Sequence, residues 1–154
     1  MRKVFLAVPL LVVAAVALFA VGLGGAAAGA SSAAGIAPTE VAQAGANACE
    51  GGKKVDGAGV YDLNFGTFTI HLTITVTPRD VGGPFVAFQS SDPEELVTSI
   101  FVKGGNTANL YVYPNGIQSD SLLHAPVNPN GNQGATVKYY GLSHLCIFAD
   151  KVSA

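Results

Sequence analysis

Ser143, His124 and Asp120 are residues of the types that hydrolases combine in a catalytic triad. In a triad the histidine removes the proton of the serine, and the carboxylate orients the histidine. Both Ser143 and His144 lie in a predicted strand, whose neighbouring residues point to opposite faces, so we expect that His144 cannot activate Ser143 and that only Ser143 with His124 remains possible. The sequence also lacks the Gly-x-Ser-x-Gly turn that exposes the nucleophile of α/β-hydrolases. We therefore predict a protein that is not an enzyme and has a binding, adhesion or structural role at a surface. An extracellular hydrolase that uses Ser143 and His124 is the alternative. A carbohydrate-binding module is a further alternative, which the absence of Trp disfavours.

The other polar residues predict neither a metal site nor a cofactor site. Residues 128–132 offer oxygen ligands near Asp120 and His124, but a calcium site needs several carboxylates and none lies between Asp120 and Asp150. The cysteines lack the neighbouring cysteine or histidine pairs of a structural zinc site. Lys103-Gly104-Gly105 lacks the remaining residues of a phosphate-binding loop, so we predict a strand that ends in a glycine turn.

Two tyrosines and a long connection are the candidates for a binding surface. Tyr111 and Tyr113 are two residues apart and share one face of a predicted strand, either as an exposed platform or packed in the core. The connection 115–139 is long for a small domain, and long ordered connections are often functional. It contains Asp120 and His124. We predict that these four residues bind a cell-wall component, a glycan or a surface protein. The competing prediction is an internal network of Asp120, His124 and Lys103.

Cys49 and Cys146 are the only cysteines of the chain. Disulfides persist in proteins that are exported to an oxidising compartment. We therefore predict a bridge between them, which closes a loop of roughly 100 residues and contributes about 4–5 kcal/mol by chain entropy.

The first 30 residues have the pattern of a secretory signal. Arg2 and Lys3 precede an uncharged apolar run, and Ala28-Gly29-Ala30 is the predicted cleavage site before Ser31. The alternative is an uncleaved anchor, since about 20 apolar residues can span a bilayer, and only then would the protein contact a membrane. Residues 31–48, rich in Ala, Gly and Ser, are predicted to be a flexible leader, and residues 49–154 the folded domain.

The composition excludes one class of partner. Charged residues make up 12% of the chain, and its net charge is −2. Without Arg2 and Lys3, six basic and ten acidic residues remain. Nucleic-acid binding needs clustered Lys and Arg, so we predict no nucleic-acid partner.

The hydrophobic pattern predicts an all-β domain. In the segment 67–77 apolar residues alternate strictly with polar ones, mostly threonines, as in a strand with one buried and one solvent-exposed face. Further strands are predicted at 60–63, 85–89, 96–103, 108–113 and 140–148, separated by Gly, Pro and Asn. The last one is apolar on both faces, which is typical of a central strand. Short strands at this spacing favour an antiparallel β-sandwich, Ig-like or jelly-roll-like.

Three ordered motifs resemble a β-module of exported and cell-surface bacterial proteins. That family has the pattern Cys-Glu-Gly-Gly-x-Lys, then Val-Lys-Gly-Gly, then Ser-His-x-x-Phe-Cys. The matching residues are 49–54, then 102–105 with Lys103, Gly104 and Gly105, then 140–145 with Ser143 and His144. The family's last cysteine falls two residues later, where this chain has Phe148. The resemblance implies a secreted or surface module and implies no reaction.

Overall fold

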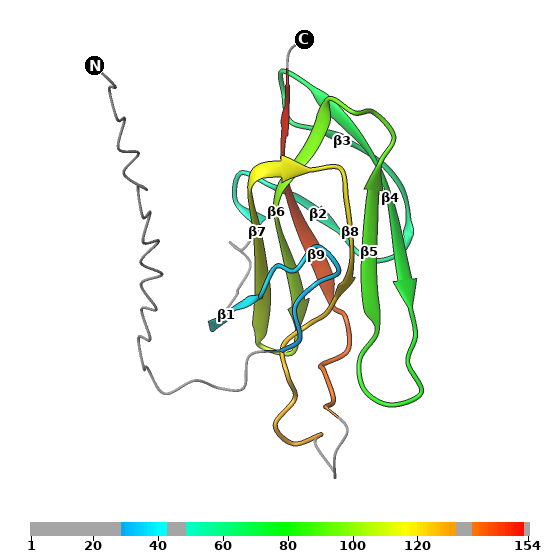
Figure 1. Cartoon of the computed structure of the whole chain (residues 1–154), viewed down its shortest axis with the longest axis vertical. Helices are drawn as coiled ribbons and strands as arrows, with labels where there is room; N and C mark the ends of the chain where they lie inside the picture. The colour runs from blue at the N-terminus through cyan, green and yellow to red at the C-terminus, as the bar shows by residue number, and fades with distance from the viewer. Residues whose placement is uncertain (1–28, 43–48, 132–136, 153–154) are drawn as a thin grey trace, which may run out of the picture.

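The computed structural model describes residues 29–42, 49–131 and 137–152. Nine strands form in this part of the chain (Figure 1). They are β1 (Thr39–Ala42), β2 (Lys53–Val55), β3 (Gly59–Asn64), β4 (Thr69–Thr77), β5 (Phe85–Ser90), β6 (Glu95–Gly104), β7 (Thr107–Ile117), β8 (Ser119–Leu123) and β9 (His144–Lys151). The predicted signal lies outside the described residues, except for its last two residues. No helix that could cross a membrane occurs in the described part.

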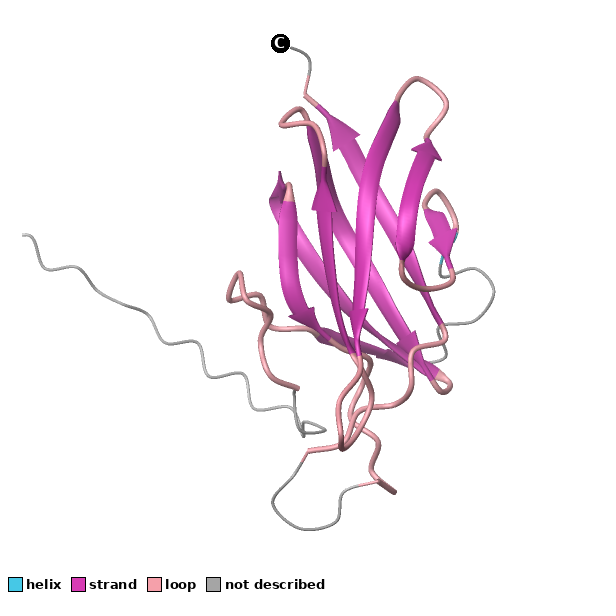
Figure 2. Ribbon diagram, turned by 90° about the vertical axis from the view of Figure 1, so that its right-hand side faces the viewer, coloured by secondary structure: helices cyan, strands magenta, loops and turns pink. Residues whose placement is uncertain are grey.

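The strands form two antiparallel sheets that pack face to face (Figure 2). Sheet A has the order β1-β7-β6-β9-β2, and sheet B has the order β3-β4-β5-β8. Apolar side chains of both sheets meet between the two layers and form one core, which includes Ile70, Leu72, Ile100, Leu123 and Ile147. The predicted antiparallel β-sandwich is confirmed.

β4 shows why the alternation was informative. Ile70, Leu72 and Ile74 are buried in the core, whereas Thr73 and Thr75 between them are exposed on the outer face of sheet B. A period of two places every second side chain on one face, so the sequence pattern also orients the strand. The predicted last strand begins later than expected, at His144, and it lies between β6 and β2 inside sheet A.

Residues 29–42, here called the N-terminal strap, are part of the fold. The amide of Ala33 donates to the carbonyl oxygen of Ser121 in β8 (2.9 Å), and β1 pairs with β7 at the edge of sheet A. The strap therefore runs from β8, an edge strand of sheet B, to its own strand β1, which forms an edge of sheet A (Figure 1). Residues 31–42 thus differ from the flexible leader that was expected at 31–48, because backbone hydrogen bonds compensate for their few apolar side chains. The rest of the predicted leader, 43–48, lies outside the described residues.

The predicted bridge between Cys49 and Cys146 is confirmed. It joins the chain before β2 to β9, and the two Cα atoms are 5.0 Å apart. The two cysteines are separated by 97 positions in the sequence, and the loop that the bridge closes contains β2 to β8 and the start of β9.

Candidate functional site

The four residues predicted to form a binding surface lie inside the protein. Tyr111, Tyr113, Asp120 and His124 are 0%, 4%, 7% and 0% exposed. Of the two alternatives for Tyr111 and Tyr113, the structure shows packing in the core and not an exposed platform, because the face of β7 that carries both tyrosines faces the core. Of the predicted internal network, Asp120 and His124 are buried, whereas the ammonium group of Lys103 donates to the carbonyl oxygen of Gly105 (3.3 Å) at the surface.

His124 is held by contacts from three directions. Its Nε2 lies 2.8 Å from the carbonyl oxygen of Ala30 in the strap, and its Nδ1 lies 2.8 Å from the carbonyl oxygen of Ala125. Asn109 donates to the backbone carbonyl oxygen of His124 (3.0 Å). The ring stacks on Tyr139 with 3.8 Å between the centroids. These contacts fix the imidazole inside the core.

Asp120 is a buried carboxylate with three donors. Its Oδ2 accepts a hydrogen bond from the hydroxyl of Tyr113 (2.8 Å), and its Oδ1 accepts from the amides of Ala34 (2.9 Å) and Ser121 (2.8 Å). Burial, the hydrogen bond to Asp120 and the charge of Asp120 raise the pKa of Tyr113 well above its ordinary value. Tyr113 therefore stays protonated and keeps donating to the carboxylate.

Ser143 contacts its neighbour His144 rather than His124. Ser143 precedes β9, and its Oγ lies 3.2 Å from Nδ1 of His144 at the surface. The expectation that adjacent residues could not meet is therefore wrong, since strand alternation does not hold for a residue outside the strand. Partial burial and the charges of Lys54 and Lys103 lower the pKa of His144. No hydrogen bond of His124 in the described part of the chain involves Ser143.

Gly104 and Gly105 of the Lys103-Gly104-Gly105 motif have a structural role at the end of a strand. Gly104 ends β6 and leaves no room for a side chain against Ala125 and Tyr140. Gly105 has a φ of 61° in the two-residue loop between β6 and β7, a conformation that favours glycine. The predicted strand that ends in a glycine turn is confirmed.

His144 also lies near the sulfur atoms of Cys49 and Cys146, but these are joined in the disulfide and are not thiolate ligands.

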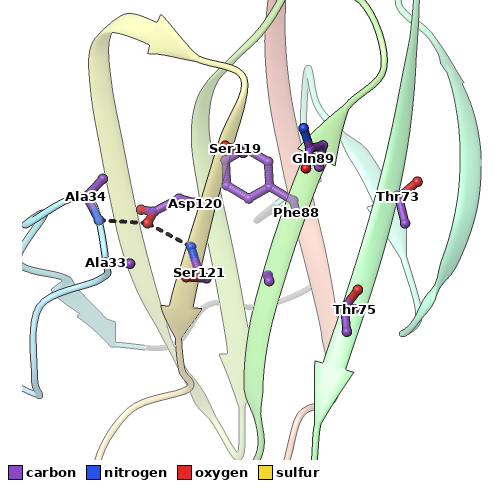
Figure 3. Close-up of a pocket in the computed structure, with 10 residues that line it drawn as sticks. Ala33, Ala34, Thr73, Thr75, Phe88, Gln89, Ser119, Asp120 and Ser121 are labelled. Atoms are coloured by element: carbon purple, nitrogen blue, oxygen red, sulfur yellow. Dashed lines mark hydrogen bonds between the residues drawn. The ribbon is translucent and has the colours of Figure 1, made fainter.

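A groove on the outer face of sheet B is the clearest candidate site (Figure 3). Its volume is about 650 Å³, β4, β5 and β8 form its floor, and the strap contributes Ala33 and Ala34. The strand register places Thr73 opposite Gln89, and Gln89 opposite Ser119, so these three side chains form one polar row. Thr75 and Ser121 add two further hydroxyls.

The sequence alone indicated only part of this groove. Threonines on the polar face of β4 were visible in the alternating pattern, but they were interpreted as ordinary exposed residues. Gln89 lies on β5, the next strand of the chain, whereas Ser119 and Ser121 lie on β8, which is far from β4 in the sequence. Isolated Ser and Gln residues carry no local signal, because only strand pairing brings them together.

Sequence analysis also did not predict a buried acid, Glu95, which contacts His71 near the start of β4. Glu95 is 1% exposed, and its carboxylate accepts hydrogen bonds from the amide (2.8 Å) and Nδ1 (2.9 Å) of His71. The ammonium group of Lys151 lies 3.7 Å from the same carboxylate. Burial raises the pKa of Glu95, but the hydrogen bonds and charge of His71 and the hydroxyl of Ser90 outweigh it and lower the pKa. This cluster joins the two sheets.

Comparison with known proteins identifies no protein that is similar to this chain. No protein-family model matches the chain, and no curated protein or solved structure matches it. The groove, the buried clusters and the disulfide are therefore the observations from which the function is inferred.

Proposed function

We propose that this protein is an exported, non-catalytic β-module that binds a neutral glycan chain in the outer groove of sheet B. The observation that carries the proposal is the polar row of Thr73, Gln89 and Ser119. Hydroxyl and amide groups can both donate and accept hydrogen bonds, as the hydroxyl groups of sugars require. Loops and surfaces on a rigid sandwich are well suited to recognition.

The charge of the groove favours a neutral ligand. Asp120 is the only ionisable residue among those that line it, and its carboxylate already accepts three hydrogen bonds. An anionic ligand would therefore find no cationic side chain there, and the Asp120 carboxylate is buried with its oxygens already bound to donors of the protein. A hydroxyl-rich ligand would find the side chains of Thr73, Thr75, Gln89, Ser119 and Ser121.

The shape of the groove favours a chain over an enclosed small molecule. Its volume of about 650 Å³ lies within the range of ligand sites, roughly 300–1,000 Å³. Thr73, Thr75 and Gln89 on its floor are exposed, so the groove is open to solvent and does not enclose a ligand. Phe88, the aromatic residue of the lining, is only 2% exposed and contacts Tyr113 edge-to-face in the core, so it offers little stacking surface, which predicts modest affinity for each sugar unit.

Three observations support export. The disulfide between Cys49 and Cys146 is of a kind that persists outside the reducing cytosol. Arg2 and Lys3 followed by an apolar run are typical of a secretory signal. The resemblance of the three motifs to exported and cell-surface modules agrees with this. The hydrolase alternative has less support, because His124 is buried and its ring nitrogens already face backbone carbonyl oxygens.

A glycan array probed with the exported protein tests the proposal. We expect binding to neutral glycans, and Gln89→Ala should weaken it about 10-fold because the centre of the polar row is lost. Thr77→Val is the matched control: Thr77 is an exposed threonine of β4 outside the groove lining, and this change should leave binding unaltered. Undiminished binding by a folded Gln89→Ala protein would contradict the proposed site, and no binding to any neutral glycan would contradict the ligand class.

A further inference from the structure

Three side chains with metal-ligating atoms meet beside sheet A at the disulfide. One ligand atom from each of Cys49, His144 and Cys146 lies within 4.8 Å of the other two. In the part of the chain that the structure describes, no other three cysteine, histidine or acidic side chains come together in this way. β9 carries His144 and Cys146, and the fold brings Cys49 to them across 97 positions of sequence.

The two sulfur atoms cannot ligate a metal while they are bonded to each other, but reduction frees them. A dithiol reductant transfers two electrons and two protons to the bridge, the S–S bond breaks, two thiols form, and the reductant is left as a disulfide. When Zn²⁺ binds, the two thiols release their protons and ligate as thiolates. We propose that the reduced protein binds Zn²⁺ through Cys49, Cys146 and His144, so that the bridge and the metal are alternative links at one position.

The ligand chemistry favours zinc. Two thiolates and one imidazole are a ligand set that Zn²⁺ adopts in proteins, with the fourth position left to water. Cys49 and His144 are partly exposed, so water can reach the site. Cys146 is fully buried, and the charge of Zn²⁺ balances that of the two thiolates, so no net charge is left beside the core.

The geometry requires only a local movement. Tetrahedral zinc, with bonds of about 2.0–2.3 Å, separates its ligand atoms by about 3.5–4 Å, so the sulfur atoms must move apart after reduction. Cys146 is fixed in β9, between β6 and β2 of sheet A. Cys49 lies outside the strands, in a turn in which Gly51 has a φ of 78°. The movement therefore falls on this turn and leaves the sheet unchanged.

The neighbouring side chains leave the site open to a cation. Oγ of Ser143 lies 3.2 Å from Nδ1 of His144 and orients the imidazole, as partners of metal-ligating histidines do. Two lysines lie next to the site in the strand register. The ammonium group of Lys54 pairs with Asp56 (2.9 Å), and that of Lys103 donates to a carbonyl oxygen of the loop between β6 and β7 (3.3 Å). Both positive charges are therefore directed to other partners.

The zinc site is separate from the proposed glycan site. It lies at sheet A, whereas the groove lies on the outer face of sheet B. The inference therefore goes beyond the proposed function, and neither depends on the other.

Zinc binding by the full chain in two redox states tests the inference. The protein is reduced with a phosphine under argon or left oxidised, dialysed against ZnCl₂ and then against buffer, and its zinc is measured by elemental analysis. We expect about one Zn²⁺ per reduced chain and less than about 0.1 per oxidised chain, because only free thiols ligate. Equal zinc contents of the two forms, or no zinc in the reduced form, overturn the inference.

Histidine variants distinguish the native site from random coordination by free thiols. We expect His144→Ala to weaken Zn²⁺ binding by the reduced chain at least about 10-fold and His144→Asp, which keeps a ligand, to restore most of it. His71→Gln is the matched control: His71 is a partly exposed histidine of sheet B, and its loss should leave zinc binding unaltered. Equal affinities of the His144→Ala protein and the parent overturn the inference.

A thermal measurement covers the case in which the reduced chain loses stability. Because the metal replaces the lost link, we expect Zn²⁺ at about 100 times its Kd to raise the Tm of the reduced protein by at least about 10 °C, or to restore its circular dichroism if it has unfolded. The His144→Ala protein should show a much smaller change. A reduced parent protein whose stability does not respond to Zn²⁺ overturns the inference.

Discussion

Buried polar side chains are matched with partners at two ends of the sandwich. Asp120 accepts three hydrogen bonds near the strap, and Glu95 accepts hydrogen bonds from His71 and Ser90 where the two sheets meet. A buried carboxylate without such donors would cost several kcal/mol. Each cluster is therefore stabilising only while all of its members are present.

Replacement of Glu95 should reveal the size of this effect. We expect Glu95→Ala to lower the free energy of unfolding by about 1–3 kcal/mol, because the groups that it binds lose a buried acceptor. Urea unfolding followed by circular dichroism measures the change. Asp62→Ala is the control: Asp62 lies 3.9 Å from Nε2 of His71 but is largely exposed, so its loss should change stability by less than about 0.5 kcal/mol. Equal effects of the two changes would contradict the assignment of Glu95.

Low pH should remove the stabilisation of the fold that the ionised carboxylate of Glu95 provides. Its pKa in the folded protein is lowered from the ordinary value of 4.5, so its ionised form stabilises the fold at every pH above that value. The contribution is lost as the pH falls through the lowered folded pKa. We expect Glu95→Gln to be less stable than the parent protein at neutral pH and the difference to shrink below pH 4.5. Urea unfolding over a pH series measures it, and a difference that grows with acid would contradict the direction of the shift.

At the scale of elements, β8 contains an irregularity that the sequence did not reveal. Val86 of β5 pairs with Leu123, but Phe88 pairs with Asp120, so β8 has one extra residue. Leu122 lies in this bulge with a φ of 61°. A residue with a Cβ is strained there, whereas glycine is not. The bulge also interrupts an edge strand, which makes pairing with another chain less favourable.

Glycine should therefore have opposite effects at two equally exposed positions. Leu122 and Val112 are both 48% exposed, but Val112 lies in β7. We expect Leu122→Gly to be neutral or to stabilise by up to about 1 kcal/mol, because it relieves the left-handed conformation. Val112→Gly should destabilise by about 1 kcal/mol, since it weakens a regular strand. Thermal unfolding of both variants measures the difference. The same loss at both positions would exclude strain at Leu122.

At the scale of the whole molecule, the sandwich separates the Glu95 cluster and its basic residue from the groove. Glu95 and Lys151 lie outside the groove lining, which contains no Lys, Arg or His. The binding energy should therefore come from hydrogen bonds and not from the net charge of the protein.

The dependence of binding on salt tests this separation. We expect the affinity for a neutral glycan to change less than about 2-fold between roughly 50 mM and 500 mM NaCl, because no ion pair is screened. Calorimetric titration at the two salt concentrations measures it, with Lys103→Ala as a control that removes a charge outside the groove. A steep loss of affinity with salt would indicate an anionic or cationic polymer as the ligand.

The sequence by itself determined the class of fold and the disulfide. Strict alternation over 69–77 orients β4, and that information is local, because each residue carries its own preference for core or solvent. Only two cysteines are present, so only one pairing within the chain was possible. The strands β1, β2 and β8 escaped sequence analysis, since they are short and are held by their neighbours' hydrogen bonds.

Only the tertiary structure decided where the site residues lie. The pattern of Tyr111 and Tyr113 specified one shared face but not which face, and the packing of sheet B against sheet A placed both rings in the core. The contact of His124 with Ala30 joins residues 94 positions apart, and that of Asp120 with Ala34 joins residues 86 apart. The groove likewise combines side chains from three strands and the strap. Such proximity depends on how distant segments pair, and no local stretch of sequence carries that information.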